Sequence, residues 1–105
     1  SPFGALEQAV VEERLAVTGW ALDNRPLDRV DVMVDGYVIG RLPIEVDRPD
    51  VCGQWTSYRA CPTVGFQGSL EWPRQAVGEH TVDIRATDAH GNSRIIGRRQ
   101  INWTP

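Results

Sequence analysis

The chain has 105 residues, a mass of 11.7 kDa and a formal net charge of −3 at pH 7. This length suits one domain, and the apolar fraction of 41% is ordinary for a soluble globular protein. No apolar run approaches the roughly 20 residues that cross a bilayer, and a negative charge disfavours nucleic acid, which needs a clustered positive field. We therefore expect a single domain over residues 1–105, with no membrane insertion and no nucleic-acid partner.

Alternation of apolar and polar residues predicts that the chain is almost entirely β-structure. About seven short strands are expected, in chain order at residues 6–11, 15–22, 29–34, 37–42, 65–72, 80–87 and 95–103. Residues 48–55 are the exception and could hold a single helical turn. Short strands at this spacing, separated by turn formers, predict an all-β antiparallel sandwich of two sheets rather than a parallel α/β sheet.

Asp35-Gly36 marks the clearest hairpin in the sequence. A three-residue loop, with Gly36 in the left-handed conformation, would pair Val32 with Val38 across the hairpin. That register places Val30 and both of these valines on the buried face, whereas a two-residue loop does not. The hydrophobic pattern therefore predicts the three-residue loop.

A second hairpin is expected between the last two strands. Its connection contains Asp88, Gly91 and Asn92, which we interpret as turn builders rather than as metal ligands. The side chains expected to face the core from strands 65–72, 80–87 and 95–103 are Phe66, Leu70, Val82, Ile84, Ala86, Ile95, Gly97, Ile101 and Trp103.

The two cysteines, Cys52 and Cys61, are nine residues apart in one loop-like stretch. There is no C-x-x-C pair and no third or fourth cysteine ligand, so a zinc site is not expected. We predict a disulfide, which indicates an oxidising compartment and would contribute about 2.7 kcal/mol by closing the loop. The alternative is a pair of unrelated reduced thiols.

Three stretches together resemble bacterial immunoglobulin-like or fibronectin-type-III-like domains of secreted and cell-surface proteins. They are TGWALD at 18–23, VDVMVDGYVIG at 30–40, and GEHTVDIRATD at 78–88 running on to Gly91-Asn92. The motif RPDV at 48–51, followed by Gly65-Phe66, is similar to a subgroup with a long insertion, here about 46–64, between its middle strands. All eleven basic residues are arginine, which also favours a bacterial source.

The resemblance implies a secreted, cell-surface or periplasmic module that acts as a spacer, an adhesion or carbohydrate-binding module, or an accessory to an attached enzyme. Its implied partners are neighbouring domains of the same polypeptide, a polysaccharide or another surface protein. The family contributes no catalytic residue to this sequence. The chain departs from antibody domains because both cysteines lie in one loop and cannot join the two sheets.

Catalytic and metal-binding patterns are weak. His80 heads a strand and His90 sits in a turn, and neither lies in a G-x-S-x-G or H-E-x-x-H motif, so we predict no enzyme and no cofactor. Asp47 and Asp50 could contribute to calcium binding, but their spacing matches no calcium loop. The favoured interpretation is that Asp50 caps the helical turn, while Arg48 pairs with a carboxylate or with loop carbonyls.

The aromatic residues of the cysteine-bounded loop are the main functional candidates. Trp55 and Tyr58, beside Gln54 and Arg59, would suit a sugar site, because the apolar faces of sugar rings stack on aromatic planes. A disulfide would hold this platform still and reduce the entropy cost of binding. The alternative is that Trp55 folds over the sandwich edge as a lid. The other tryptophans are expected in the core or, for the last, as an end-strand anchor: Trp20, Trp72 and Trp103.

Overall fold

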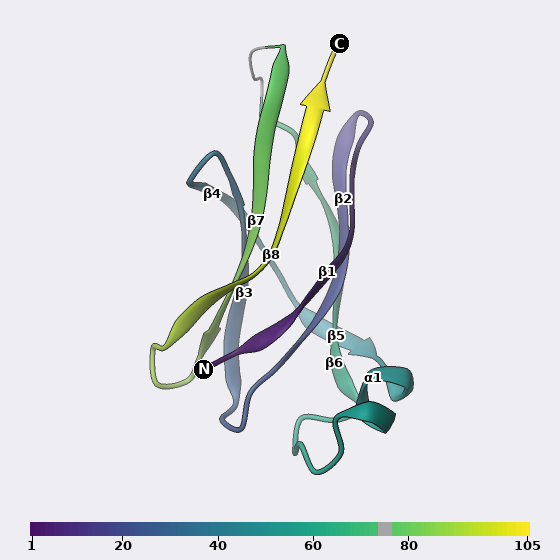
Figure 1. The fold of residues 1–105 in the computed structure, drawn as a ribbon, viewed down its shortest axis with the longest axis vertical. Helices are drawn as coiled ribbons and strands as arrows, with labels where there is room; N and C mark the ends of the chain where they lie inside the picture. The colour runs from purple at the N-terminus through teal and green to yellow at the C-terminus, as the bar shows by residue number, and fades with distance from the viewer. Residues whose placement is uncertain (74–76) are drawn as a thin grey trace.

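A computed structural model describes residues 1–73 and 77–105 of the chain. Within these residues there are eight strands and one short helix (Figure 1). Their bounds are β1 Phe3–Val11, β2 Arg14–Leu22, β3 Leu27–Val34, β4 Tyr37–Leu42, β5 Ile44–Asp47, α1 Pro49–Gln54, β6 Thr63–Glu71, β7 Gly78–Asp88 and β8 Ser93–Trp103. The seven predicted strands are present, as is the helical turn. The additional strand is β5, a four-residue strand whose pairing with β6 is irregular.

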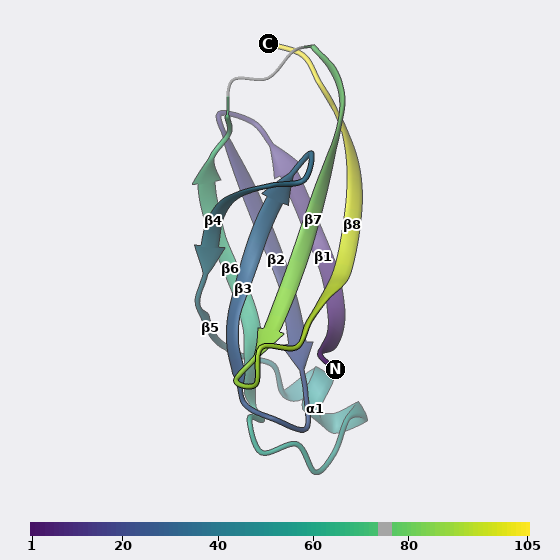
Figure 2. The same cartoon turned by 90° about the vertical axis from the view of Figure 1, so that its left-hand side faces the viewer.

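The strands form two antiparallel sheets that face each other. One sheet has the order β1-β2-β6-β5 and the other has the order β4-β3-β7-β8. Figure 2 shows the two layers and the helix α1, which lies at one end of the molecule. The molecule is elongated, with principal extents of 44 × 26 × 17 Å. The predicted antiparallel two-sheet sandwich is confirmed.

Alternate residues of the central strands fill the space between the sheets, as the pleat of a β-strand requires. The predicted core positions Phe66, Val82, Ile84 and Ala86 are at most 1% exposed. Trp72 is also buried as predicted, and Leu70, Ile101 and Trp103 pack against this core. The strand periodicity in the sequence therefore identified most of the core correctly.

The turn at Asp35-Gly36 differs from the prediction. It is a two-residue turn in which Val34 pairs with Tyr37, and both turn residues have positive φ, 50° and 87°. This matches the type I′ geometry that suits the twist of a hairpin. Val38, predicted to be buried, is 51% exposed, and Val34 is buried instead.

The hydrophobic pattern is reconciled with this turn by a β-bulge. The register shifts between Val32 and Met33, so that Met33 pairs with Val38 but Val32 pairs with Gly40. Ile39 is the extra residue, and it packs against the core. The prediction of a three-residue loop was wrong because it assumed an unbroken alternation in β4.

A second bulge changes the inward face of β8. Ile84 pairs with Gly97 and Arg85 with Ile95, which leaves Ile96 as the extra residue. Ile96 therefore packs against the core, while Ile95, predicted to face inward, is 39% exposed. A single inserted residue reverses the phase of the side chains on either side of it.

Candidate functional site at the loop end of the sandwich

The segment between β5 and β6 is a loop closed at its base by three connections. The Thr63 hydroxyl donates to Asp47 Oδ1 at 2.8 Å, and the Arg48 main-chain N–H donates to the Pro62 carbonyl at 2.8 Å. Further along, Cys52 and Cys61 form the predicted disulfide, with their Cα atoms 5.9 Å apart. The loop is thus held by covalent and hydrogen bonds rather than by a sheet register alone.

Helix α1 forms the first half of this loop. Its first residue is Pro49, whose missing N–H costs nothing at this position. The N-cap residue is Arg48, and no side chain caps the helix. The prediction that Asp50 is the cap was therefore wrong: Asp50 lies within the first turn, where its negative charge favours the helix N-terminus.

Arg48 connects this helix to β1. Its guanidinium donates to the Asp50 carboxylate at 3.0 and 2.8 Å, and Nη2 also donates to Glu7 Oε2 at 3.0 Å. The hydrogen bonds from Arg48 lower the pKa of Asp50 to about 2. Arg48 is therefore a fixed structural cation whose charge is already matched by two carboxylates.

A second, smaller hydrophobic cluster lies beneath the loop. Leu22, Val51 and Val64 are its buried members, and the disulfide packs against them. Val51 comes from α1, whereas Leu22 and Val64 come from the neighbouring strands β2 and β6. Burial of Val51 therefore anchors the loop to the sheet independently of the disulfide.

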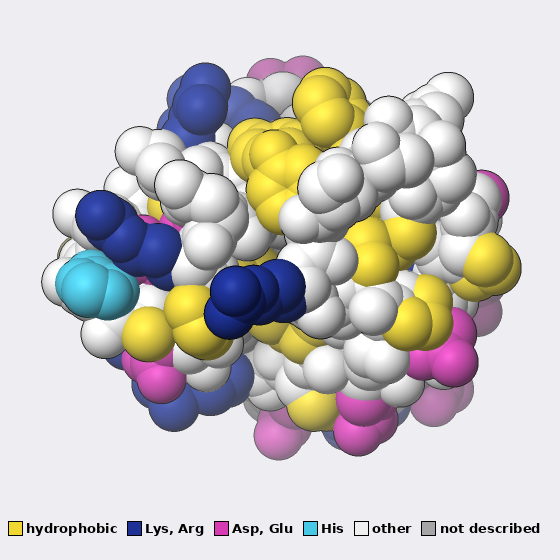
Figure 3. All heavy atoms as spheres, turned by 90° about the horizontal axis from the view of Figure 1, so that it is seen from below, with side chains coloured by type: hydrophobic (Ala, Val, Ile, Leu, Met, Phe, Trp, Pro, Cys, Tyr) yellow, Lys and Arg dark blue, Asp and Glu magenta, His cyan; other side chains and the backbone are white. Residues whose placement is uncertain are grey.

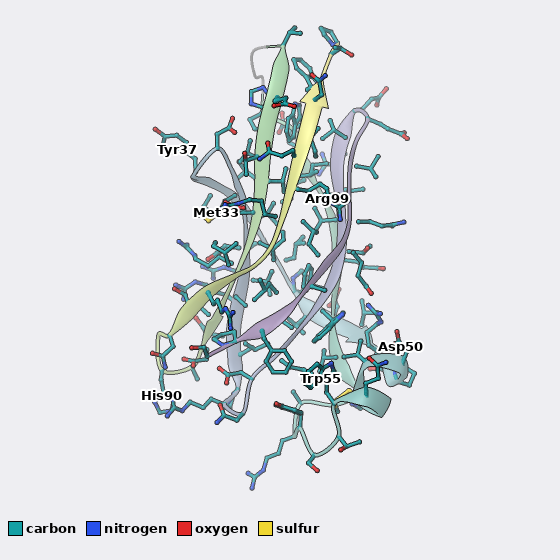
Figure 4. The ribbon with its side chains drawn as sticks, viewed as in Figure 1. Met33, Tyr37, Asp50, Trp55, His90 and Arg99 are labelled. Atoms are coloured by element: carbon teal, nitrogen blue, oxygen red, sulfur yellow. A yellow bond between two sulfur atoms is a disulfide. The ribbon has the colours of Figure 1, made fainter. Side chains whose placement is uncertain are left out.

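Four aromatic rings gather over this small core, and we call them the aromatic cluster: Phe3, Trp20, Trp55 and Tyr58. The ring of Phe3 is central, with its centroid 6.0 Å from Trp20, 4.9 Å from Trp55 and 5.8 Å from Tyr58. Trp55 lies between the loop and the lower part of β1 and β2 (Figure 4). It remains 42% exposed, so it combines packing with accessible surface.

Two adjoining hollows lie beside the aromatic cluster. One, of about 340 Å³, is lined by Asp23, Asn24, Arg25, Pro26, Arg59 and Ala60. The other, of about 360 Å³, is lined by Asn24, Thr56, Ser57, Tyr58 and Arg59. Because they share Asn24 and Arg59, we treat them as one feature, the loop-end groove. Its walls are the β2–β3 turn at 23–26 and the tip of the disulfide loop.

The exposed charged side chains that line this groove are positive. Among the residues that the structure describes, neither Arg25 nor Arg59 forms an ion pair or a hydrogen bond. Asp23 also lines the groove, but its side chain is only 1% exposed. Figure 3 shows this end of the molecule, where basic side chains lie among hydrophobic ones.

The residues predicted for binding differ in how close they lie to the aromatic cluster and the groove. Trp55 and Tyr58 both contact Phe3, and Arg59 lines both hollows. Gln54 is exposed at the end of α1 and lines neither hollow.

Sequence reasoning missed Phe3, Trp20, Asn24 and Arg25. Trp20 was predicted to lie in the core, but it is half-buried and belongs to the aromatic cluster. Its place in β2, out of phase with the buried Gly19 and Ala21, was the available signal.

The other predicted positions serve the turns. Asp35 Oδ2 lies 2.6 Å from His80 Nδ1, and Asp35 Oδ1 accepts the Thr81 N–H at 2.9 Å. Asp88 Oδ1 accepts the main-chain N–H groups of His90 and Asn92 at 2.8 and 3.0 Å, and Gly91 has a φ of 86°. Over residues 1–73 and 77–105, no set of three His, Cys, Asp or Glu side chains could hold a metal ion, and no helix has the length and apolarity to cross a membrane.

No protein-family model matches the chain, and no curated protein matches it in sequence. Among solved structures, it is similar to the fibronectin(III)-like modules of CbhA from Clostridium thermocellum. The sequences are 21% identical, the TM-score is 0.58, and the match covers 95% of this chain and 94% of that one. The chain has a fibronectin(III)-like fold. The expected resemblance is thereby confirmed at the level of architecture.

In this fibronectin(III)-like sandwich, three connections gather at the same end of the molecule (Figure 1). They are the β2–β3 turn, the disulfide loop and the β7–β8 turn. The Ala89 N–H donates to the Pro26 carbonyl at 2.8 Å, which links two of them, and the groove joins the third. This end of the molecule carries the aromatic cluster and the groove.

Proposed function

We propose that this chain is a non-catalytic structural and interaction module of a larger bacterial protein that is secreted, periplasmic or exposed at the cell surface. The observation that carries the proposal is the course of the chain through the sandwich. β1 begins in the half of the molecule that holds the loop end, and β8 ends at the opposite extreme of the 44 Å long axis (Figure 1). Such a module extends a polypeptide along its length, and its partners are the neighbouring domains.

The Cys52–Cys61 bond supports the proposed compartment, because disulfides persist mainly outside the reducing cytosol. The test is thiol titration of the unfolded, unreduced protein isolated from its native host. We expect no free thiol. Two titratable thiols per chain would count against export.

Force spectroscopy tests the spacer role. Pulled through its two ends, the module is expected to unfold in one event. Reduction of the disulfide should lengthen the unfolded chain by about 25 Å, because nine residue steps of about 3.4 Å replace the 5.9 Å between the Cα atoms of the bridged cysteines. Gradual extension at low force, with no cooperative event, would contradict the role of a spacer that resists mechanical force.

A second function, carbohydrate binding at the loop end, is favoured by the exposed part of Trp55. This ring contacts Phe3, and the residue that follows it, Thr56, lines a groove with amide and hydroxyl side chains, a combination that suits stacking and hydrogen bonding to sugar. Affinity electrophoresis with a panel of polysaccharides tests it. Trp55→Ala and Tyr58→Ala are expected to abolish retardation.

Tyr37→Ala is the matched control, because Tyr37 is a 79% exposed aromatic residue in the β3–β4 hairpin, outside the aromatic cluster. This variant should bind like the parent. Binding that survives both loop substitutions would place the site elsewhere on the molecule.

A further inference from the structure

We infer that the loop-end groove selects carboxylated sugars, so that the ligand is an acidic polysaccharide built from uronic acid residues. This inference rests on the proposed carbohydrate-binding function and specifies its substrate class. It comes from the charge of the groove, which the aromatic cluster alone does not define.

Half of the ten arginines that the structure describes are neutralised by ion pairs. Five of those in the described residues form ion pairs with aspartate or glutamate: Arg29, Arg41, Arg48, Arg85 and Arg98. Two more use their guanidinium groups in hydrogen bonds, Arg14 with Ser69 and Arg99 with the Leu6 carbonyl. Arg25, Arg59 and Arg94 do neither, although the chain carries a net charge of −3 and offers many carboxylates, and of these three only Arg25 and Arg59 line the groove. Their positive charge is therefore available to a ligand.

The acidic residues near the groove do not pair with Arg25 or Arg59. The side chain of Asp23 is 1% exposed, and Asp28 is hydrogen-bonded to Arg29 at 2.6 Å. Asp88 is 1% exposed and its carboxylate accepts three hydrogen bonds from the β7–β8 turn. An anionic ligand in the groove therefore meets exposed guanidinium groups, whereas the nearest carboxylates are buried or already paired.

The groove combines this charge with the features that a sugar ring requires. Each hollow has a volume at the lower end of the roughly 300–1,000 Å³ common for ligand sites. Tyr58 provides aromatic surface beside Arg59, and Asn24 is a hydrogen-bonding group shared by both hollows. Trp55 lines neither hollow, but its ring contacts Phe3, which also contacts Tyr58. A guanidinium can donate two parallel hydrogen bonds to a carboxylate, which gives an acidic sugar both affinity and orientation.

The groove is small and only two of its lining residues, Arg25 and Arg59, are cationic, whereas a nucleic acid requires a longer run of basic side chains. Two arginines set among aromatic and hydroxyl side chains fit a pyranose ring that carries one carboxylate.

The test is titration calorimetry of the whole chain with polygalacturonate, alongside the neutral galactan as comparison. We expect binding to polygalacturonate only, with Arg59→Gln and Arg25→Gln each weakening it by roughly tenfold or more, because each removes a charge-assisted hydrogen bond. Arg94→Gln is the matched control: Arg94 is exposed and without an ion pair in the described part of the chain, but lines neither hollow. Circular dichroism and thermal melts should show that all three variants are folded.

Each outcome separates the inference from the function on which it rests. Equal binding of galactan and polygalacturonate, lost in Trp55→Ala, would overturn the acidic-sugar inference and leave carbohydrate binding intact. No binding to polygalacturonate would overturn the inference, and no binding to any polymer of the polysaccharide panel would overturn the carbohydrate-binding function as well. Binding to heparin that is tighter than to polygalacturonate and unaffected by Trp55→Ala would show a general polyanion surface, and this would also overturn the inference.

Discussion

The ring of Phe3, in the first strand, lies 4.9 Å from the ring of Trp55, at the end of helix α1, with an interplanar angle of 61°. This pair joins the edge of the β1-β2-β6-β5 sheet to the disulfide loop. The same Phe3 ring also contacts Trp20 and Tyr58, so it is the common neighbour of the other three aromatic residues.

Phe3→Ala is expected to loosen the loop end. Removing the ring deletes three aromatic contacts, each worth about 0.5–1.5 kcal/mol, so the free energy of unfolding should fall by about 1.5–4.5 kcal/mol. Urea denaturation followed by circular dichroism measures this change, and acrylamide quenching of tryptophan should increase. Tyr37→Ala, at a 79% exposed residue, should change stability by no more than about 0.5 kcal/mol. If the free energy of unfolding falls by a similar amount in the two variants, the contacts of Phe3 do not stabilise the loop end.

Replacing both Cys52 and Cys61 by serine should destabilise the chain by about 2–3 kcal/mol, because the nine-residue loop is then open in the unfolded state. The sheets should persist, since Val51 still anchors α1 in the small core beneath the loop. Guanidinium denaturation gives the value, and the parent protein in reducing agent should match the variant. A variant as stable as the oxidised parent would mean that the disulfide only positions the loop.

Gly97→Ala tests the approach of the two sheets at the β1 and β8 edge. A Cβ atom at Gly97 would lie 2.4 Å from Leu6 Cβ and 2.9 Å from the Leu6 nitrogen, and main-chain atoms cannot move aside cheaply. We expect a loss of about 1–3 kcal/mol from overpacking. Gly53→Ala is the control, because a Cβ there meets nothing within 4 Å and alanine favours the helix by up to about 1 kcal/mol. Thermal melts should therefore show that the melting temperature falls in Gly97→Ala, and that it rises or changes far less in Gly53→Ala.

Asp88 is expected to make the free energy of unfolding depend on pH in the acidic range. Burial raises the pKa of its carboxyl, but the hydrogen bonds from Asn92 and His90 outweigh burial and lower the pKa to about 2. Because the pKa in the unfolded chain is near 4, the ionised group stabilises the fold above about pH 4, and this contribution disappears as the pH falls through about 2. Urea midpoints of the parent should therefore drop over that interval.

The Asp88→Asn variant isolates this contribution. It should be less stable than the parent at pH 6, and its urea midpoint should fall less between pH 4 and pH 2. Parallel pH profiles for the two proteins would place the acid sensitivity in other carboxylates.

The sequence alone determined the architecture because strand alternation is a local property. Val82, Ile84 and Ala86 enter the core as the pleat dictates, while Asp83 and Arg85 between them form ion pairs, and this apolar-polar alternation can be read without knowledge of the neighbouring strands. The disulfide was predictable for a similar reason, since two cysteines nine residues apart in one loop come close whatever the sheets do.

Only the tertiary structure decided the register and the site. The bulges at Ile39 and Ile96 depend on pairing with another strand, so an unbroken local pattern assigned Val38 and Ile95 to the wrong face. The aromatic cluster and the loop-end groove combine β1, β2, the β2–β3 turn and the disulfide loop. Contacts between segments so far apart in the chain arise only when the sandwich packs. For this reason the sequence of the loop predicted Trp55 and Tyr58 as binding residues but gave no sign of Phe3 or Arg25.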